Sequence, residues 1–491
     1  EELRSSLQKD GYVFESETDT EVVAHLIHQK LQSGKSMLAA VKETTKKLRG
    51  AYALGVISLD NPDQIIAARE GSPLVLGVGL GENFIASDVS ALLPVTQNFM
   101  FLEDGDIAEL TRESIKVYNA QGELVEREVK QSSLSASSVE LGEHRHYMHK
   151  EIFEQPISIA DCMRGRLNAE SGELVLGGIR NYAKALENAE RIIIIACGTS
   201  WHAGLVAEYI FEDLCHIPVE VEYASEFRYR NPVINEGDIV IAISQSGETA
   251  DTLGALDEVK RKNGLTLGIV NVVGSSVARK IDAGVYNHAG PEIGVAATKS
   301  FTAQLVIIYK IVEKLSNDEI KIDFDKISES VSKTLDKPIR IQIIAQKLKN
   351  ISDIYVLGRG VHYPIAIEAA LKLKELTYIH AEGIPGGELK HGPLALMDES
   401  VFVLIINPND STYSDTLTSA REIKARGAKI IGISDVESDV YDYWIEISKV
   451  EESMYPISEI IPIQLLSYYA ALEKDTDPDY PRNLAKSVTV K

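Results

Sequence analysis

At residues 192–200 the chain reads IIIIACGTS, an apolar run of strand length that ends in a glycine and two hydroxyl side chains. A second run, IVIAI at 239–243, ends in the polar cluster SQSGET at 244–249. Helical patterns follow both clusters and continue to Leu214 and Lys262. Short apolar strands that alternate with helices are typical of a parallel sheet covered on both faces. The sequence therefore predicts an α/β domain around these residues.

The same layout recurs later in the chain, at a nearly constant offset of roughly 160 residues. The triplet DTL at 251–253 returns at 415–417, and Gly268, inside a predicted strand, has its counterpart in Gly432. Solenoid repeats have far shorter periods, so this pattern indicates a duplicated domain. We predict two copies of one doubly wound parallel-sheet domain, at residues 150–330 and 331–491.

The first 130 residues have a different pattern, which predicts an α+β domain. Thr18 and Glu21 have the spacing of a capping box, and a helical pattern runs from there to Gly34. GVGLG at 77–81 resembles a dinucleotide-binding motif, but no strand–helix–strand unit surrounds it, and we interpret it as a hairpin turn. Antiparallel strands are predicted at 51–59, 74–78, 99–102 and 114–119, and a serine-rich linker at 131–149.

Composition and charge exclude several classes of protein. The 491 residues carry 50 Lys and Arg against 73 Asp and Glu, a formal net charge of −23. This balance argues against nucleic acid or an anionic membrane surface as the main partner. The longest apolar runs are far shorter than the roughly 18 residues of a membrane helix. Three cysteines without a CxxC pair give neither a disulfide framework nor a thiol–metal site. We predict a cytoplasmic protein that needs no metal or cofactor.

Hydroxyl-rich clusters follow two neighbouring strands of the first copy. Ligands of open α/β sheets bind beyond the carboxyl ends of the strands, where the N-termini of helices favour anions. The clusters therefore predict a phosphate cradle that needs no basic patch. Helix capping alone is the commoner role of Ser and Thr, but two clusters after adjacent strands favour binding. The candidate side chains are Thr199, Ser200, Ser244, Gln245, Ser246 and Thr249.

The second copy has lost these hydroxyl groups and carries ionisable side chains instead. Asn407 and Pro408 stand in the place of the first copy's polar cluster. Lys372 and Glu375 are three residues apart and share a helix face, and His391 follows in a glycine-rich segment. Such groups could transfer protons beside a carbonyl. A solvated ion pair and a structural histidine are the alternatives, and no motif with metal-ligand spacing is present.

Long stretches of this sequence resemble the glutamine–fructose-6-phosphate aminotransferase (isomerizing) family, also called glucosamine-6-phosphate synthases. The resemblance covers essentially the whole chain. It implies a pair of sugar-isomerase (SIS) domains at 150–491, preceded by the later part of an N-terminal-nucleophile glutaminase domain at 1–130. The motifs that carry it include SETDTEVVAHL at 16–26, RHYMHKEIFEQP at 145–156, ACGTSWHAG at 196–204, SQSGETADTL at 244–253, EIGVAATKSFTAQL at 292–305, KLKELTYIHAEGIPGGELKHGPLAL at 372–396 and PRNLAKSVTV at 481–490.

The resemblance also implies a reaction and a role for each site residue. The family converts fructose 6-phosphate and ammonia from glutamine into glucosamine 6-phosphate. By resemblance, Glu375 moves the proton from C1 to C2, with Lys372 beside it, and His391 opens the sugar ring. Lys486 forms an imine with the open-chain ketose, so the acidic tail before it becomes an ordered segment. The six hydroxyl and amide side chains of the first copy bind the phosphate, and Val295 and Ala485 line the sugar.

One departure from the family concerns the glutaminase half. The family's glutaminase uses the thiol and amine of an N-terminal Cys, whereas residue 1 here is Glu. Only Asp19 matches the family's glutamine site, as the residue that holds the substrate's α-amino group. We therefore interpret the sequence as lacking the first part of this domain, and expect no glutamine hydrolysis by these residues.

Family resemblance implies a homodimer or a larger homo-oligomer, in which His391 reaches the neighbouring subunit's site. Two other functions are weighed against the enzyme. A non-catalytic SIS-type sugar-phosphate sensor would keep the hydroxyl clusters but would not need Glu375, His391 and Lys486 together. An isolated glutaminase is disfavoured because the nucleophilic Cys is missing.

Overall fold

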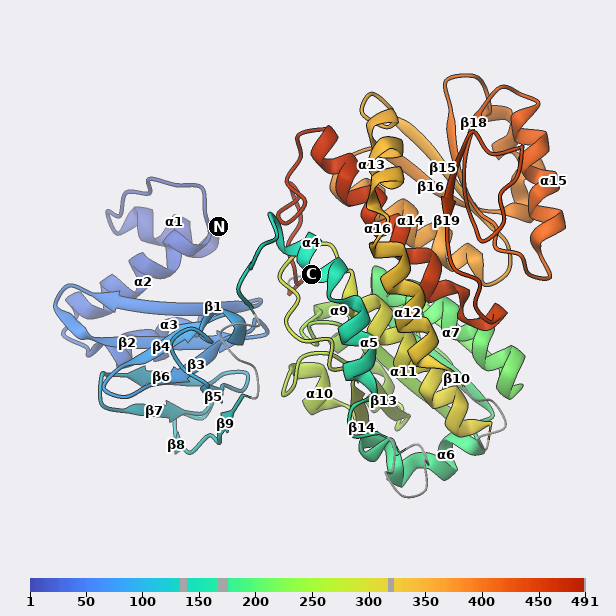
Figure 1. Cartoon of the computed structure of the whole chain (residues 1–491). Helices are drawn as coiled ribbons and strands as arrows, with labels where there is room; N and C mark the ends of the chain where they lie inside the picture. Colours follow the sequence, from blue (N-terminus) through green and yellow to red (C-terminus); the bar gives the residue numbers. More distant parts are fainter. Residues whose placement is uncertain (133–138, 167–174, 317–321, 490–491) are drawn as a thin grey trace. The chain divides into compact units, whose positions relative to one another are not determined.

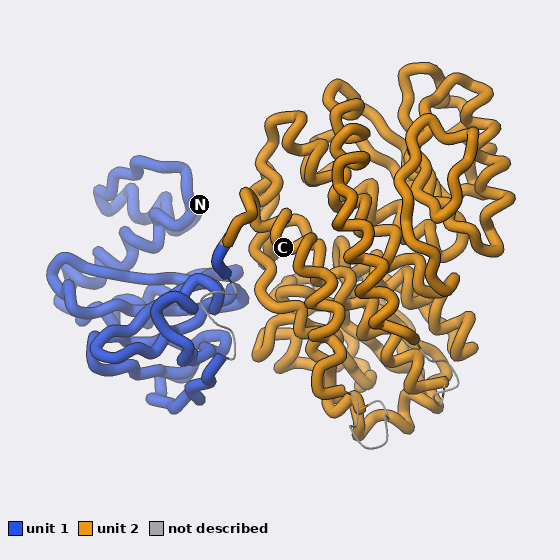
Figure 2. Tube along the Cα trace, in the orientation of Figure 1, with its two compact units in different colours: residues 1–140, 489–491 blue, residues 141–488 orange. Residues whose placement is uncertain are grey.

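In the computed structural model the protein forms two compact units, unit 1 at residues 1–140 and 489–491 and unit 2 at residues 141–488 (Figure 2). The structure describes residues 1–132, 139–166, 175–316 and 322–489. Each unit has its own sheets and its own buried apolar clusters. The two units are therefore described separately.

Unit 1 combines helices with two antiparallel sheets, which confirms the predicted α+β class (Figure 1). Its helices are α1 (Glu2–Lys9), α2 (Thr20–Gln32) and α3 (Met37–Thr45). One sheet has the order β1 (Tyr52–Ser58), β2 (Asn61–Glu70), β6 (Ile107–Leu110), β7 (Ile115–Tyr118) and β8 (Leu124–Val125). The other has the order β4 (Asn83–Ala86), β3 (Val75–Val78), β5 (Asn98–Phe101) and β9 (Val129–Gln131).

Local details of unit 1 correct two predictions and confirm a third. Glu21 does not close a capping box with Thr18: its carboxylate accepts hydrogen bonds from the backbone N–H groups of Glu15 and Ser16 instead. Strand β9, which pairs with β5, was not predicted and overlaps the start of the predicted linker at Gln131, while residues 133–138 lie outside the described residues. The predicted hairpin at 77–81 is confirmed, because β3 and β4 pair antiparallel around it.

Unit 2 contains two parallel five-stranded sheets of identical strand order, which confirms the duplication (Figure 1). Continuous apolar runs form these strands because both faces of each sheet are covered by helices. The first sheet runs β11 (Val219–Tyr223), β10 (Arg191–Ala196), β12 (Asp238–Ser244), β13 (Leu265–Val270) and β14 (Ala283–Tyr286). The second runs β16 (His380–Pro385), β15 (Asp353–Gly358), β17 (Phe402–Ile406), β18 (Lys429–Ser434) and β19 (Tyr443–Glu446).

Four helices join the two copies into one core. The long helices α7 (Thr199–Cys215) and α11 (Lys299–Leu315) of the first copy pack with α14 (His362–Thr377) and α16 (Tyr455–Glu473) of the second. Helix α11 is buried on all sides from Lys299 to Glu313, as expected for a helix at the centre of a large core.

The remaining helices cover the sheets or connect the copies. They are α4 (Tyr147–Phe153), α5 (Gln155–Met163), α6 (Ala183–Glu187), α8 (Ala224–Phe227), α9 (Ala250–Arg261), α10 (Ser276–Lys280), α12 (Phe324–Leu335), α13 (Pro338–Lys347) and α15 (Tyr413–Lys424). Short 3₁₀ helices are η1 (Val89–Ala91), η3 (Gly177–Tyr182), η4 (Gly386–His391), η5 (Pro393–Leu396) and η6 (Glu452–Met454).

The tail after α16 returns to the first copy. The backbone N–H of Val295 donates to the carbonyl of Asp479 at 2.9 Å, and that of Ala250 donates to the carbonyl of Val488 at 3.0 Å. Val295 lies in the segment between β14 and α11, and Ala250 is the first residue of α9, which follows β12, so both donors lie at the carboxyl edge of the first sheet. The tail is therefore an ordered segment of unit 2.

Candidate active site

The loop after β10 turns directly into helix α7. Gly198 makes the turn with φ +56°, a conformation that favours glycine, and the helix begins at Thr199. The hydroxyl of Ser200 is buried and accepts a hydrogen bond from the Gln304 side chain at 2.9 Å. The first predicted cluster is thus fixed at the N-terminus of a long helix, where an anion is favoured.

In the loop after β12, two serine hydroxyl groups accept hydrogen bonds from the loop's own backbone. Ser244 Oγ accepts from the N–H of Gly247 at 2.9 Å, and Ser246 Oγ accepts from the N–H of Glu248 at 3.2 Å. Gly247 has φ +66°, and a Cβ atom there would lie 2.0 Å from Ser275 Oγ. Glycine is therefore required at this turn both by conformation and by space.

Helix α14 of the second copy brings its ionisable face to the first of these loops. Lys372 is completely buried and donates to Thr199 Oγ1 at 3.2 Å and to Glu375 Oε2 at 2.5 Å. Thr199 Oγ1 in turn donates to Glu368 Oε1 at 3.1 Å, and Glu368 Oε2 lies 2.6 Å from His202 Nδ1. Burial alone would lower the pKa of Lys372, but Glu375 and Glu368 raise it above its usual value. Lys372 and Glu375 are thus not a solvated ion pair.

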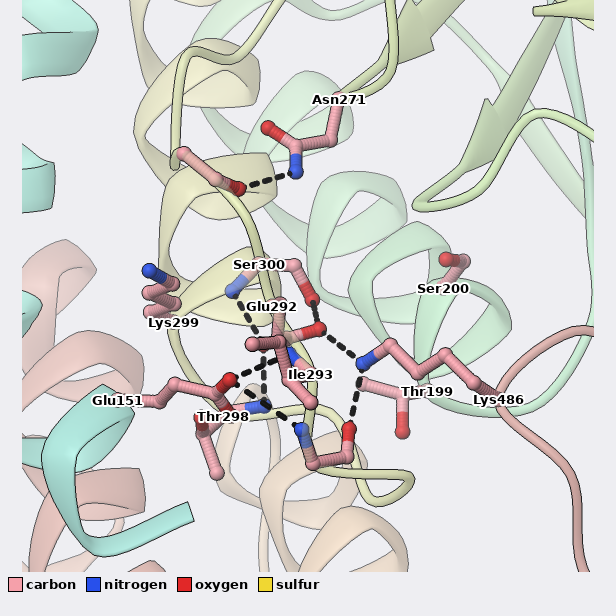
Figure 3. A network of polar contacts seen from close by, with 12 residues as sticks. Glu151, Thr199, Ser200, Asn271, Glu292, Ile293, Thr298, Lys299, Ser300 and Lys486 are labelled. Atoms are coloured by element: carbon pink, nitrogen blue, oxygen red, sulfur yellow. Dashed lines mark hydrogen bonds and ion pairs between the residues drawn. The ribbon is translucent and has the colours of Figure 1, made fainter. Parts of the chain in front are cut away.

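The tail places Lys486 at the same edge of the first sheet (Figure 3). Its Nζ donates to Glu292 Oε2 and to the carbonyl of Gly294, both at 2.7 Å. The buried Glu292 carboxylate also accepts from the N–H groups of Thr298 (2.9 Å) and Ser300 (3.0 Å) and from Ser300 Oγ (2.8 Å). Burial opposes ionisation of Glu292, but Lys486 and these donors outweigh it and lower the pKa of the carboxyl group.

A second buried carboxyl group, Glu151 on α4, lies on the other side of the segment that follows Glu292. It accepts hydrogen bonds from the backbone N–H groups of Ile293 and Gly294 (Figure 3). Burial, and then the negative charge of Glu292, raise the pKa of Glu151. The pKa of Glu292 is thus lowered and that of Glu151 is raised. This difference is expected of two neighbouring carboxyl groups, because the charge on one disfavours ionisation of the other.

Comparison with known proteins identifies the family. SIS domains match residues 185–314 and 347–474, and a glutamine amidotransferase domain matches residues 1–94. The glutamine–fructose-6-phosphate aminotransferase (isomerizing) of Chlorobaculum tepidum is 45% identical over 504 residues, covering 99% of this chain and 82% of that protein. The one of Acinetobacter baylyi is 46% identical over 511 residues, covering 100% of this chain and 83% of that protein. The chain belongs to the glutamine–fructose-6-phosphate aminotransferase (isomerizing) family.

Solved structures agree with this assignment. The C-terminal domain of the glucosamine–fructose-6-phosphate aminotransferase from Francisella tularensis is 39% identical, covers 70% of this chain and 100% of that domain, and superposes with a TM-score of 0.65. A glucosamine-6-phosphate deaminase from Thermotoga maritima shares the fold at 22% identity with a TM-score of 0.57. The predicted fold class, two SIS domains after a glutaminase-type domain, is confirmed, and the chain is an isomerizing aminotransferase.

The structure gathers most of the predicted site residues in unit 2, but not all of them. Thr199, Lys372 and Glu375 are linked by hydrogen bonds, and Lys486 lies at the same sheet edge. His391 is exposed at the end of η4, and no contact described in the structure joins it to these side chains. Gln245, Ser246, Thr249 and Val295 are half-buried, Ala485 is exposed, and Asp19 is exposed at the start of α2 in unit 1.

Sequence reasoning missed the carboxyl groups that surround the two lysines. Glu368 precedes Lys372 by one helical turn, so the helical spacing on α14 could have pointed to it. Glu292 stands at the start of one of the resemblance motifs, but nothing in its spacing relates it to Lys486, 194 residues away. Glu151 stands in another of these motifs, but no spacing points to its partners, which are backbone N–H groups of a distant segment.

The second copy presents a different group at the equivalent sheet edge. His362 is completely buried; its Nε2 lies 2.7 Å from Asp410 and its Nδ1 lies 2.8 Å from Glu459. Asp410 comes from the loop after β17, which corresponds to the hydroxyl loop of the first copy. This edge of the second copy thus holds carboxylates where the first copy holds hydroxyl groups.

The described residues form neither a metal centre nor a membrane-spanning helix. Within the described ranges, no group of three or more His, Cys, Asp or Glu side chains is arranged to hold a metal ion. In the same residues, no helix has the length and apolarity to cross a bilayer. Burial raises the pKa of Cys197, Cys162 and Cys215, so none of the three is an activated thiol.

Proposed function

We propose that unit 2 makes glucosamine 6-phosphate from fructose 6-phosphate and ammonia at the carboxyl edge of its first sheet. One observation carries the proposal: Lys372 of the second copy reaches Thr199 of the first copy's loop, with Glu375 on the same amine. An acid–base group and an anion-binding helix terminus thus share one site. Lys486 adds an amine at the same edge.

The loops of the first copy hold the phosphate in this mechanism. Helix N-termini and hydroxyl groups bind a phosphate without a basic cluster, which suits a chain with a net charge of −23. The bound phosphate would place the carbons of the open-chain sugar towards α14 and the tail. Val295 and Ala485, which flank Gly294 and Lys486, line the sugar in this arrangement.

The chemistry begins with the amine of Lys486, which condenses with the C2 carbonyl of the open-chain ketose and releases water. Ammonia then displaces the lysine and leaves an imine at C2. Glu375 removes a proton from C1 to give an enolamine and returns a proton to C2, so that C1 becomes the aldehyde of the amino sugar. Sugar and ammonia are consumed and one water is released.

His391 is the proposed ring-opening group, and it acts in a homodimer or larger homo-oligomer. Its exposed position on η4 supports a contribution to the site of a neighbouring subunit. Opening of the cyclic hemiketal needs a proton donor and acceptor close to neutral pH, which is the usual role of histidine.

Ammonia is the nitrogen donor that we propose for residues 1–491. Residues 1–140 contain no cysteine, and the family's glutaminase chemistry needs a thiol nucleophile by resemblance. We expect ammonium to support product formation by this chain and glutamine not to. Asp19 keeps its proposed role as a contact for the α-amino group of glutamine.

The test follows the products formed by the purified chain. With fructose 6-phosphate alone we expect glucose 6-phosphate, and with added ammonium we expect glucosamine 6-phosphate. Substitution of Lys486 by Met should abolish both products. Tight binding of fructose 6-phosphate without either product would instead support a sugar-phosphate sensor, and product formation from glutamine would contradict the proposed nitrogen donor.

A further inference from the structure

The amine of Lys486 and the carboxyl group of Glu151 hold the same short piece of backbone from opposite sides (Figure 3). Glu151 Oε1 accepts from the N–H groups of Ile293 and Gly294, the latter at 3.2 Å. Lys486 donates to the carbonyl of Gly294 at 2.7 Å. The position of the amine therefore depends on where Gly294 is held, and Glu151 holds it.

Helix α4, which carries Glu151, is itself fastened to the tail that carries Lys486. Asp479 accepts hydrogen bonds from the N–H groups of Tyr147 and Met148, the first residues of α4, at 2.9 and 2.8 Å. The carbonyl of Asp479 accepts from the N–H of Val295 at 2.9 Å. Hydrogen bonds thus connect helix α4, the segment at 293–295 and the tail to one another, and the amine of Lys486 is bound to this connected set.

Burial makes Glu151 difficult to replace in this circuit. Its side chain is 2% exposed, so water is not available to pair with Ile293 and Gly294 if the carboxyl oxygen is removed. The other oxygen, Oε2, has no hydrogen-bond partner among the described residues. All of the polar contacts of this side chain are therefore made through one acceptor atom.

We propose that Glu151 is a positioning residue for Lys486, which fixes the attacking amine through the backbone of Ile293 and Gly294. This inference rests on the proposed function, in which Lys486 forms the imine. Attack on a carbonyl requires the nitrogen within about 3–3.5 Å of the carbon, and a displacement of about 1 Å can cost about 100-fold in rate. Glu151 acts through this geometry and does not touch the sugar.

Three variants separate the parts of this role. Glu151→Gln keeps the acceptor Oε1, removes the ability to carry charge and puts an NH2 group in the place of Oε2. Glu151→Met has a side chain of similar length without an acceptor. Glu151→Asp keeps the charge but is one methylene shorter and cannot reach both N–H groups. Glu143→Met, at an exposed position that precedes α4, is the matched control.

The readout is capture of the imine by borohydride. Hydride from borohydride reduces the C=N bond between Lys486 and fructose 6-phosphate to a stable secondary amine, which peptide mass spectrometry locates on Lys486. Isomerisation to glucose 6-phosphate supplies kcat and KM. We expect Glu151→Met to lower the initial trapping rate and kcat about tenfold or more, with KM within about twofold, and Glu151→Gln to stay within about threefold of the parent chain.

The outcomes distinguish a failure of the proposed function from a failure of the positioning role of Glu151. A parent chain that neither isomerises nor traps the sugar on Lys486 overturns the proposed function itself. An active parent with an equally active Glu151→Met variant overturns the positioning role alone, as does a Glu151→Gln variant as impaired as Glu151→Met. Should Glu151→Met fail to fold, Glu151→Asp decides: slow trapping at unchanged KM supports the role, and trapping at the parent rate contradicts it.

Discussion

At the scale of single residues, the site works through pairs in which one member is buried. Lys372 is fully buried and its amine is shared between Thr199 and Glu375. A proton-transferring carboxylate needs a fixed orientation, and the buried ammonium supplies it through a hydrogen bond stronger than a neutral one. Glu375 is half-buried, and in the proposed mechanism its other carboxyl oxygen contacts the sugar.

Removal of the base should separate binding from chemistry. We expect Glu375→Gln to lower kcat for isomerisation of fructose 6-phosphate about 100-fold or more, the usual contribution of a general base. Binding of the sugar, followed by calorimetry, should change little because the phosphate loops are untouched. Glu329→Gln, which breaks an exposed ion pair with Lys333 on α12, is the control and should match the parent chain. Full isomerase activity of Glu375→Gln would contradict the assignment.

His362 gives a prediction about pH. Burial alone would lower its pKa, but Glu459 and Asp410 raise it to about 10, above the unfolded value of 6.5. A group with a raised pKa stabilises the fold fully below its unfolded pKa, and this stability is lost as pH rises through the folded value.

The corresponding variant is His362→Gln, which removes the imidazole beside the buried Glu459 and beside Asp410. We expect it to lower the free energy of unfolding by about 3–5 kcal/mol at pH 6 and by much less at pH 10.5, measured by urea unfolding at both values. His380→Gln removes an exposed histidine that pairs with Asp353 and should have little effect at either pH. An equal loss at both pH values for His362→Gln would show that the imidazolium is not the stabilising form.

The side chains of the proposed site could be named from the sequence at this scale, but the partner of Lys486 could not. Thr199, Lys372 and Lys486 stand in motifs that the sequence displays, and local spacing relates Lys372 to Glu375. Glu292 reaches Lys486 only because the tail crosses back to the first copy. A contact between segments far apart in the chain leaves no periodic pattern in the sequence, so local sequence patterns cannot predict it.

At the scale of elements, the phosphate site that we propose in the first copy depends on a tight turn between β12 and α9. Gly247 makes this turn at φ +66°, and Ser275 fills the space where a Cβ atom would lie. The turn allows Ser244 to accept the N–H of Gly247 and so orders the loop that we propose binds phosphate.

We therefore expect Gly247→Ala to weaken binding of fructose 6-phosphate about tenfold or more, because the loop must move to relieve a contact of 2.0 Å. Calorimetric titration measures the change. Gly142→Ala is the matched control: this glycine also has positive φ, but nothing lies within 4 Å of the added Cβ atom. A sugar affinity of Gly247→Ala equal to that of the control would exclude the loop from the binding site.

Elements of unit 2 were predictable from sequence to a greater extent than those of unit 1. Its strands are continuous apolar runs followed by glycine and polar residues, a pattern that few other structures produce. Strand β9 was missed because its three residues are exposed and lie at a sheet edge, so they show no alternation of polar and apolar side chains. The capping box was wrong because Glu21 finds closer donors in the preceding loop.

At the scale of the whole molecule, duplication has produced two sheets of the same strand order with different side chains at their carboxyl edges. The first edge has hydroxyl groups, and the second has His362 between two carboxylates. The constant offset made the duplication predictable from sequence. The division of labour was only partly predictable, because it depends on which helix of one copy faces a loop of the other.

Assembly of the site from two subunits can be tested by complementation. We expect Glu375→Gln and His391→Asn to be inactive separately. Coexpressed, they should form mixed oligomers in which one site has neither defect, because the symmetry of a dimer pairs one chain's His391 with the other chain's Glu375. Isomerase activity of the purified mixture should clearly exceed that of either variant. Activity no higher than that of the separate variants would place His391 in its own subunit's site.

The return of the tail to the first sheet has a practical consequence. The amine that we propose attacks the sugar follows α16, on a segment that hydrogen bonds hold at the first sheet. A proteolytic cut between α16 and Lys486 would leave this amine without a covalent link to the two sheets and their shared core. Molecules cut there would melt much like the intact protein and yet be inactive, so mass determination of each preparation matters more than its melting curve.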